Sequence, residues 1–355
     1  MSIAPWLAES WSQLAARRGA GRFPHAVLVA GPAGLGKRDF ASELVSALLC
    51  RAPQSSGLAC GSCKACVLIA ARTHPDRVVV TLEPNDEGVM RAEIVIDQIR
   101  ELSARLAMRP HAEGMQVALI DPADQLNPNA ANALLKTLEE PAADSVMVLV
   151  ADQPSRLPAT IRSRCQRVDA RFPHRDEALA WLGEQGLDAP KATELLAIMA
   201  GNPGAALGLG SDRAQELLRE VSSDMRNLVQ GRVSSSEVAA RWAKGADERR
   251  AARKIGTDPA RDPRSDGPYA DEVRVMLAAQ LARLVGSELG GQQTGVPAAA
   301  ELARLTAGGD FTKLSAWWDR ANRVRAQLRT PLRADLILLE LLRDWRALAP
   351  AAKRA

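Results

Sequence analysis

Aromatic residues make up only 3% of this chain of 355 residues, so a hydrophobic core must be built mainly from aliphatic side chains and Ala. Long apolar runs are missing as well. The apolar stretch at 145–151 is far shorter than the about 20 residues that a membrane-spanning helix needs. The sequence therefore predicts no transmembrane segment and no membrane partner.

Two further absences bear on location and partners. The N-terminus (MSIAPWLAESW) has neither the basic start nor the apolar middle of a signal peptide, so we expect a cytoplasmic protein. In that reducing compartment the five cysteines are expected to be thiols or metal ligands and not disulfides. The net charge of +4 is smaller than the localised basic excess that is typical of a dedicated DNA-binding domain.

Short apolar segments alternate with helical patterns over the first part of the chain. Strands are predicted at 25–30, 78–82, 117–120 and 146–150, and helices at 40–49, 96–107 and 127–140. This alternation predicts an α/β unit with a parallel sheet and helices on both of its faces.

Helical patterns continue almost throughout after about residue 169. The last strong pattern covers 332–345, where Leu336, Leu339, Leu342 and Trp345 lie nearly in line. The segment 244–269 is rich in mixed charge, Gly and Pro, which predicts a mobile loop.

Four cysteines are grouped with the spacing C-x9-C-x2-C-x2-C: Cys50, Cys60, Cys63 and Cys66. The two C-x2-C steps direct three thiolates towards one point, and Cys50 at a predicted helix end can supply the fourth. Four thiolates form the closed tetrahedral site that is typical of structural Zn²⁺. An iron–sulfur cluster and coincidentally buried cysteines are the alternatives. Cys165 stands apart and is expected to be a buried small residue.

A glycine-rich segment, GPAGLGK at 31–37, follows the first predicted strand. It matches G-x-x-x-x-G-K, a loop whose backbone N–H groups cradle phosphate; its candidate residues are Gly31, Gly34, Gly36 and Lys37. The next residue should be a Ser or Thr whose hydroxyl holds Mg²⁺, but it is Arg38. The pattern leaves ATP binding open between weak, magnesium-poor phosphate binding and a turn that binds nothing.

The second motif of an ATPase, the acidic residues that follow the strand at 117–120, is also incomplete. Asp121 follows the strand at 117–120, where a working ATPase of this type holds Mg²⁺ with an acid and polarises the attacking water with a Glu beside it. Here the neighbour is Pro122, which can neither accept a proton nor orient water, and Asp124 lies too far along to substitute. The sequence therefore predicts no intrinsic ATP hydrolysis.

Several motifs occur in a fixed order: HAVLVAGPAGLGK at 25–37, the four cysteines, THPD at 73–76, NPNAANALLKTLEEP at 127–141 and LPATIRSRC at 157–165. Together they resemble the bacterial clamp-loader ATPase-like subunits of the AAA+ class. The resemblance implies three domains: an AAA+ ATPase-like domain at 1–169 with a zinc-binding module at 50–66, a small helical lid at 170–211 and a helical collar for oligomerisation at 212–355.

That family contains motor subunits (gamma or tau) and a non-hydrolysing type. Motor subunits carry a Thr after the loop Lys, an Asp-Glu pair, a polar sensor where this chain has Ala151 and Asp152, and a lid Arg where it has Gly204. The departures indicate the non-hydrolysing type. The resemblance then implies a hetero-pentameric ring with delta and gamma/tau subunits, which loads the sliding clamp onto primed DNA as an accessory of the DNA polymerase III holoenzyme.

The resemblance also implies that Arg164, within Ser-Arg-Cys, is an arginine finger that acts in trans on the ATP site of a neighbouring subunit. A planar, permanently charged guanidinium suits that task. From the residues alone, a surface ion pair is the alternative. Glu139 and Glu140 end the preceding predicted helix, where carboxylates oppose the helix dipole. They either pair with basic residues across a subunit interface or are solvated.

Two other functions stay open. An active motor ATPase of the gamma or tau kind would need an unusual magnesium arrangement in place of Arg38 and Pro122, and it would hydrolyse ATP by itself. A zinc-dependent nucleic-acid binder outside any motor complex would bind DNA in a salt-dependent way, and chelation would abolish that binding.

Overall fold

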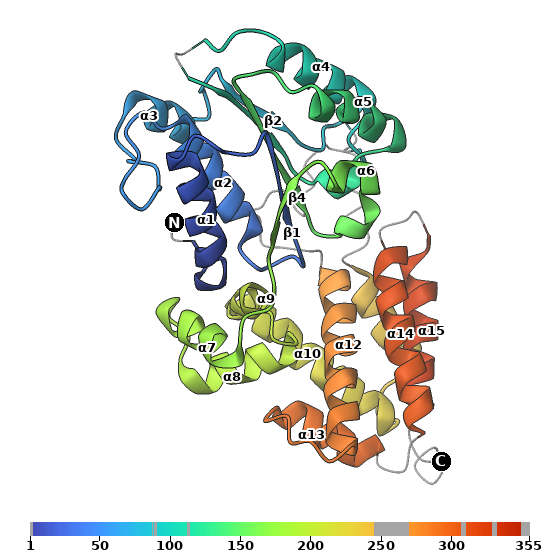
Figure 1. The fold of residues 1–355 in the computed structure, drawn as a ribbon. Coiled ribbons are helices and arrows are strands. Elements are labelled where there is room, and N and C mark those ends of the chain that lie inside the picture. The colour runs from blue at the N-terminus through green and yellow to red at the C-terminus, as the bar shows by residue number, and fades with distance from the viewer. Residues whose placement is uncertain are drawn as a thin grey trace. The chain divides into compact units, whose positions relative to one another are not determined.

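The computed structural model describes residues 3–86, 88, 91–111, 114–244, 270–306, 310–328 and 332–348. The loop predicted at 244–269 lies outside them except for Lys244. The chain divides into two compact units, unit 1 at residues 1–177 and unit 2 at residues 178–355 (Figure 1). The further division of the chain into a lid and a collar at residue 211 stays a prediction.

A parallel sheet organises unit 1 and confirms the predicted α/β class. Its strands follow the order β2-β3-β4-β1-β5. They are β1 (Ala26–Ala30), β2 (Arg77–Val80), β3 (Gln116–Ile120), β4 (Ser145–Ala151) and β5 (Gln166–Asp169). The first four were predicted from apolar runs. The sequence does not reveal β5, because Val168 is the only buried residue of this strand; it forms by pairing with β1.

The helices of unit 1 complete the alternation with the strands. They are α1 (Ala8–Gly19), α2 (Lys37–Leu49), α3 (Lys64–Ala70), α4 (Ile96–Leu106), α5 (Pro128–Glu139) and α6 (Ala159–Arg162), with 3₁₀ turns at Pro5–Leu7, Ala123–Gln125 and Pro154–Arg156. The predicted helices at 96–107 and 127–140 are confirmed to within one residue at each end, and the helix predicted at 40–49 begins three residues earlier, at Lys37.

Helices cover both faces of the sheet, as the side chains of β1 show. Ala26, Leu28 and Ala30 belong to one buried cluster together with residues of α4 and α5. Val27 and Val29 belong to another, together with residues of α1 and α2. Successive side chains of a strand point to opposite faces, so a strand covered on both sides needs apolar residues throughout. This explains the uninterrupted AVLVA.

Local signals explain the bounds of α5, the helix that ends at Glu139. The side chain of Asn127 accepts a hydrogen bond from the backbone N–H of Ala130 at 2.8 Å and caps the first turn. Pro128 suits the first helical position, where a backbone N–H has no partner in the helix. The helix ends at Glu139, shortly before Pro141, because proline cannot continue it.

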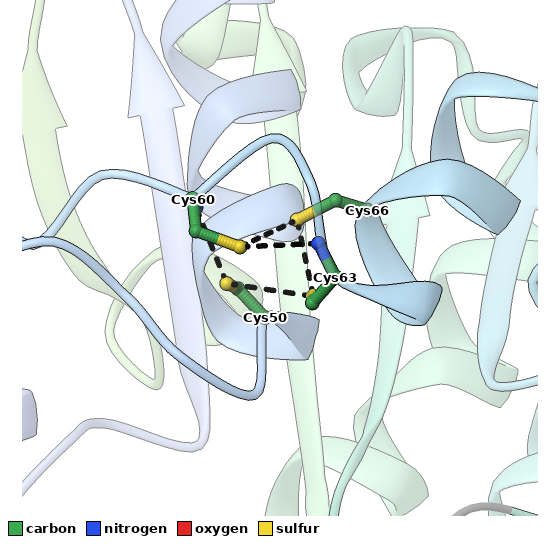
Figure 2. Close-up of side chains that lie close together, drawn as sticks. All are labelled: Cys50, Cys60, Cys63 and Cys66. Atoms are coloured by element: carbon green, nitrogen blue, oxygen red, sulfur yellow. Dashed lines mark hydrogen bonds between the residues drawn. The ribbon is translucent and has the colours of Figure 1, made fainter.

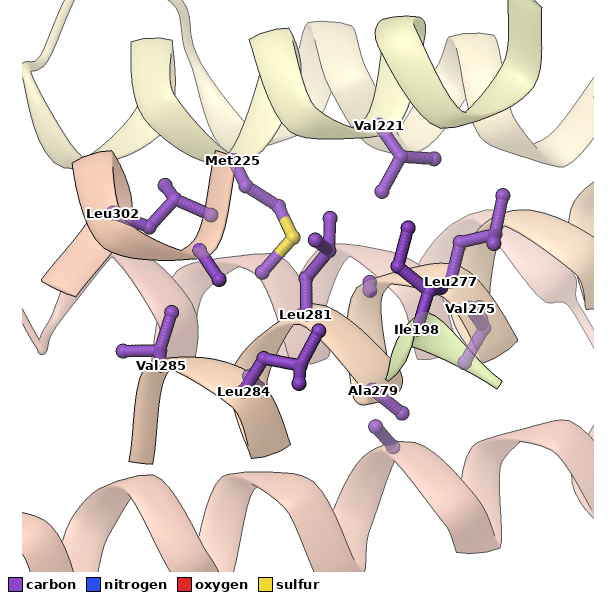
Figure 3. Close-up of a cluster of buried hydrophobic side chains, with 14 of the residues drawn as sticks. Ile198, Val221, Met225, Val275, Leu277, Ala279, Leu281, Leu284, Val285 and Leu302 are labelled. Atoms are coloured by element: carbon purple, nitrogen blue, oxygen red, sulfur yellow. The ribbon is translucent and has the colours of Figure 1, made fainter. Parts of the chain in front are cut away.

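Unit 2 is built from helices around one apolar core. They are α7 (Arg175–Glu184), which begins at the end of unit 1, α8 (Ala189–Ile198), α9 (Pro203–Leu209), α10 (Asp212–Val229), α12 (Ala270–Leu289), α13 (Pro297–Thr306), α14 (Phe311–Gln327) and α15 (Ala334–Arg346). Figure 3 shows Ile198, Met225 and Leu281 converging from α8, α10 and α12. Among the described residues, no helix combines the length and apolar character needed to cross a bilayer.

The last helix corrects one expectation. Its buried face carries Leu338, Leu341, Leu342 and Trp345, whereas Leu336 is 51% exposed. A step of three residues drifts around a helix that has 3.6 residues per turn, so residues 336 and 345 cannot share one face. The helix itself is present at nearly its predicted bounds.

Candidate functional site

The glycine-rich loop lies where β1 ends. Gly31 has a φ of 139°, and an added Cβ there would meet the carbonyl oxygen of Ala170 at 2.2 Å. Gly34 and Gly36 have φ values of 83° and 76°, in the region that favours glycine. Helix α2 begins at Lys37. The predicted sequence of strand, glycine turn and helix is therefore present.

The side chain of Lys37 is committed to partners within the protein. The residue is only 2% exposed. Its Nζ donates a hydrogen bond to the carbonyl oxygen of Pro32 at 2.6 Å and forms an ion pair with Oδ1 of Asp152 at 2.7 Å. Burial lowers the pKa of Lys37, and Asp152 opposes that shift.

Arg38 lies between two carboxylates. Its Nε donates to Oδ2 of Asp121 at 3.0 Å, and its Nη1 and Nη2 donate to the two oxygens of Asp152 at 3.3 and 3.0 Å. Asp121 follows β3 and Asp152 follows β4, two adjacent parallel strands, so both carboxylates lie at the carboxyl edge of the sheet. The planar fork of a guanidinium matches such a pair of acceptors, which a lysine ammonium would not.

Two cations and two anions therefore form a set with no net charge. Burial acts to lower the pKa of Arg38, but the hydrogen bond to Asp152 and the charge of Asp121 outweigh it and raise the pKa. Burial acts to raise the pKa of Asp152, but Arg38 and Lys37 lower it below its usual value. At Asp121 burial prevails and raises the pKa, although Arg38 opposes it. The main counter-ion of the two cations is thus Asp152.

Asp124 stabilises the turn that follows β4 and carries Asp152. It is buried, and its two carboxylate oxygens accept hydrogen bonds from the backbone N–H groups of Asp152 at 3.3 Å and Gln153 at 3.0 Å. These bonds hold the backbone that carries the Asp152 carboxylate. The peptide bond between Asp121 and Pro122 is cis.

The sulfur atoms of Cys50, Cys60, Cys63 and Cys66 converge at the end of α2 and the start of α3, all within 4.8 Å of one another (Figure 2). Three of the sulfur–sulfur distances are 3.9, 3.9 and 3.5 Å. Four sulfurs about 2.3 Å from a tetrahedral Zn²⁺ would lie about 3.8 Å apart, so the cluster fits that ion. Cys165 is buried outside this group.

Backbone N–H groups favour negative charge on two of these sulfurs. The N–H of Cys60 donates to Sγ of Cys50, and the N–H of Cys63 donates to Sγ of Cys60, both at 3.3 Å. Hydrogen bonds from the backbone of Ser62 and Cys63 lower the pKa of Cys60 to about 6. Burial raises the pKa of Cys66 to about 12. A metal ion that binds all four sulfurs at neutral pH must therefore displace the Cys66 proton.

Arg164 lies just before β5, at the end of the sheet where the parallel strands begin. The glycine-rich loop lies at the opposite end, where the strands finish. The residues of β1 alone span about 16 Å between these two ends. The Nη1 of Arg164 donates to the carbonyl oxygen of Thr160 at 2.9 Å, and its Nη2 pairs with Oε1 of Glu139 at 2.6 Å. Glu139 thus pairs within its own chain, which neither alternative drawn from the sequence predicts.

Comparison with known proteins places the chain in a family. A family model described as DNA polymerase III, delta subunit matches residues 6–173. The DNA polymerase III subunit delta' of Pseudomonas aeruginosa is 40% identical over 242 residues, which are 68% of this chain and 71% of that relative. The chain belongs to the DNA polymerase III delta' family. The delta' subunit of Escherichia coli is 38% identical over 206 residues, 58% of this chain and 60% of that relative.

A relative named as a tau subunit is similar to this delta' family member over a shorter stretch. The DNA polymerase III subunit tau of Bacillus subtilis is 35% identical over 149 residues, 42% of this chain and 25% of that subunit. The resemblance to clamp-loader subunits that the ordered motifs indicate is thus confirmed.

Two residues of the site have partners that the sequence does not reveal. Asp152 stands out in the sequence only as a replacement for a polar sensor, and Glu139 only as a helix end. Their arginine partners lie 114 positions away for Asp152 and 25 positions away for Glu139, beyond any local pattern. One usable signal exists: Asp121 and Asp152 each follow a predicted strand, and the carboxyl ends of parallel strands meet at one edge.

Proposed function

We propose that this delta' family member is a non-hydrolysing subunit of the DNA polymerase III clamp loader. It would act in the cytoplasm, in a hetero-pentameric ring with delta and gamma/tau subunits that places the sliding clamp on primed DNA. Any DNA contact would be mainly to the phosphate backbone. The names of the relatives support the assignment. The observation that carries it is the guanidinium of Arg38 between Asp121 and Asp152.

Arg38 follows the loop lysine, where a hydrolysing loop has the hydroxyl that holds Mg²⁺. Mg²⁺ demands oxygen ligands in a nearly octahedral arrangement. At this edge the two carboxylates are already engaged by Arg38 and Lys37, so an added metal ion would meet two positive charges. Pro122 supplies no base for water. This group of charged side chains is therefore suited to joining the ends of the strands and not to catalysing hydrolysis.

Arg164 is proposed as the arginine finger for the ATP site of a neighbouring motor subunit. Its place at the edge opposite its own loop supports action on another chain, because the strands separate it from that loop. A guanidinium stabilises the charge on the phosphoryl oxygens in the transition state, and fingers of this kind contribute roughly 10³–10⁵ in rate in related nucleotide hydrolases.

For the cysteine cluster we propose a structural Zn²⁺ held by Cys50, Cys60, Cys63 and Cys66. Protein sulfur would occupy all four positions of a tetrahedral ion, which leaves none for a substrate. The ion would join the end of α2 to the start of α3 and fix the loop between them.

Reconstitution tests the proposed function. The chain is mixed with delta and gamma/tau subunits, co-purified, and assayed for ATP turnover alone and in the complex with the sliding clamp and primed DNA. We expect co-purification, no turnover by the chain alone, and turnover by the complex that depends on this chain. Robust turnover by the isolated chain would indicate a motor subunit. Failure to co-purify, together with chelator-sensitive DNA binding, would indicate a nucleic-acid binder.

A further inference from the structure

Glu139 and Arg164 lie where helices α5 and α6 of unit 1 contact each other. Glu139 is the last residue of α5, and Arg164 lies two residues beyond the end of α6. The Nη2 of Arg164 and Oε1 of Glu139 form an ion pair at 2.6 Å. Thr160 holds the other terminal nitrogen, Nη1, through its carbonyl oxygen at 2.9 Å. Two acceptors within the same chain therefore fix the guanidinium.

These contacts leave donors available for another molecule. A guanidinium carries five N–H groups; the hydrogen bond to Thr160 uses one on Nη1, and the ion pair with Glu139 engages Nη2. The N–H of Nε and the second N–H of each terminal nitrogen remain. The side chain is also 36% exposed. Arg164 is thus restrained without losing its capacity to donate to phosphoryl oxygens.

Holding the guanidinium in place is an advantage when an arginine must bind a ligand in one geometry. A free surface arginine samples many rotamers, and ordering it on binding opposes the binding. Two fixed acceptors impose that order beforehand. The C-terminal end of α5 adds to the effect, because the negative end of a helix dipole attracts a cation. The place of Glu139 at this helix end gives Arg164 both attractions at once.

We propose that Glu139 is a positioning residue for the arginine finger: together with the carbonyl oxygen of Thr160, it holds the Arg164 guanidinium in the orientation that meets ATP on the neighbouring subunit. This inference rests on the proposed function, which supplies the neighbour and the reaction. Glu139 touches no nucleotide and acts through Arg164 alone.

A carboxylate could also compete with phosphate and restrain the finger from acting. Two observations favour positioning. Thr160 shares the guanidinium through a neutral carbonyl oxygen, which is a weaker competitor for it than a charged phosphate. The ion pair is also partly exposed, with 36% of the Arg164 side chain and 50% of the Glu139 side chain accessible, so solvent screens the attraction that a phosphate must overcome.

Steady-state ATP hydrolysis by the reconstituted complex tests this role, with full-length chains that carry Glu139→Ala or Glu139→Gln. Glu139→Ala should lower kcat about two- to fivefold, the range that a partly exposed ion pair supports. The KM for ATP should stay unchanged, because the finger stabilises charge that develops in the transition state. Glu139→Gln should retain most of the rate, since its amide oxygen still accepts a hydrogen bond. Glu140→Ala, a matched carboxylate at the same helix end, should leave kcat unchanged.

A double variant separates positioning from a general structural effect. Glu139→Ala combined with Arg164→Ala should turn over ATP at the rate of Arg164→Ala alone, because Glu139 has no other route to the reaction. A further loss in the double variant, or a faster Glu139→Ala complex, would overturn the positioning role. So would a wild-type rate for Glu139→Ala while Arg164→Ala is slow. An unchanged rate for Arg164→Ala would remove the finger itself, and the proposed catalytic role of this chain with it.

Discussion

Arg38 and Arg164 have side chains of almost equal exposure, 37% and 36%, and each pairs with carboxylate. They differ in the partners that hold them. Arg38 donates from three nitrogens to two aspartates, and a buried lysine shares one of these. Arg164 meets a single glutamate and one backbone carbonyl. Exposure alone therefore does not tell which arginine can act on another molecule.

The difference between the two sites lies in the charge around each arginine. At Arg38, two cations and two anions balance where the parallel strands end, and under the proposed function the guanidinium takes the place of the metal ion that a motor subunit would hold. At Arg164, one half-exposed carboxylate steadies the side chain and leaves most of its donors unused. One fold thus contains a guanidinium that is held by two aspartates and another that keeps donors for a ligand, which under the proposed function is ATP on a neighbouring subunit.

Substitution of the two arginines should affect the rate of ATP hydrolysis very differently. Arg164→Ala should slow ATP hydrolysis at the neighbouring site that it completes about 10³-fold, while the melting temperature of the chain changes little, because a surface ion pair contributes little stability. Arg38→Ala should leave the turnover of the complex near that of the wild type. Steady-state ATPase assays and thermal melts of both variants check this, and a slow Arg38→Ala complex beside a wild-type rate for Arg164→Ala would contradict it.

Metal removal should affect the region of Arg38 more than that of Arg164, because the cysteine cluster lies at the end of α2, the helix that carries Arg38 near its start. Metal analysis should find close to one zinc per chain. Cys63→Ser should lower the zinc content and cost unit 1 about 3 kcal/mol or more, as the loss of a metal site usually does. Hydrogen exchange should rise in α2 before it rises in α6. A metal-free chain of full stability would contradict this prediction.

The free energy of unfolding should fall more for Arg38→Ala than for Arg164→Ala, the reverse of their effects on the rate. Arg38→Ala leaves Asp121 and Asp152 without their shared cation, and we expect a loss of about 2 kcal/mol in the free energy of unfolding. Adding Asp152→Asn should recover part of that loss, since it removes one uncompensated charge. Urea denaturation of the single and double variants measures this. Equal losses for Arg38→Ala and Arg164→Ala would remove the distinction drawn between the two sites.

The smallest expected effect is a pH dependence at the Arg38 site. The pKa of Asp152 is lowered in the folded chain, so its stabilising contribution is complete above about pH 4, near the ordinary Asp pKa. It is lost as the pH falls through the lower pKa of the folded state. The difference in unfolding free energy between the wild type and Asp152→Asn, on the order of 1 kcal/mol at neutral pH, should therefore shrink in acid. A difference that stays constant with pH would contradict this origin.

The sequence predicts much of unit 1, because its signals there are local. Uninterrupted apolar runs indicate strands covered on both faces, Asn127 and Pro128 mark the start of α5, and the spacing from Cys50 to Cys66 indicates a cluster that the fold does assemble. Each of these patterns lies within a short stretch of chain. Local chemistry is therefore sufficient to predict them.

The remaining features depend on contacts between distant residues. β5 has almost no apolar signal and forms because the edge of β1 is available for pairing. The partners of Arg38 and Arg164 are brought to them by the sheet order and by the meeting of α5 with α6. The face of α15 that is buried depends on which helices pack against it. Such features follow from the tertiary arrangement, which a single sequence does not display.

Under the proposed function, Arg38 occupies the place where a motor subunit would need a metal ion. Calorimetric titration of the isolated chain with ATP, with and without Mg²⁺, combined with a turnover assay, tests it most directly. We expect that Mg²⁺ brings no gain in nucleotide affinity and that the chain alone turns over no ATP. Tighter binding of ATP with Mg²⁺, followed by its hydrolysis in the isolated chain, would contradict it.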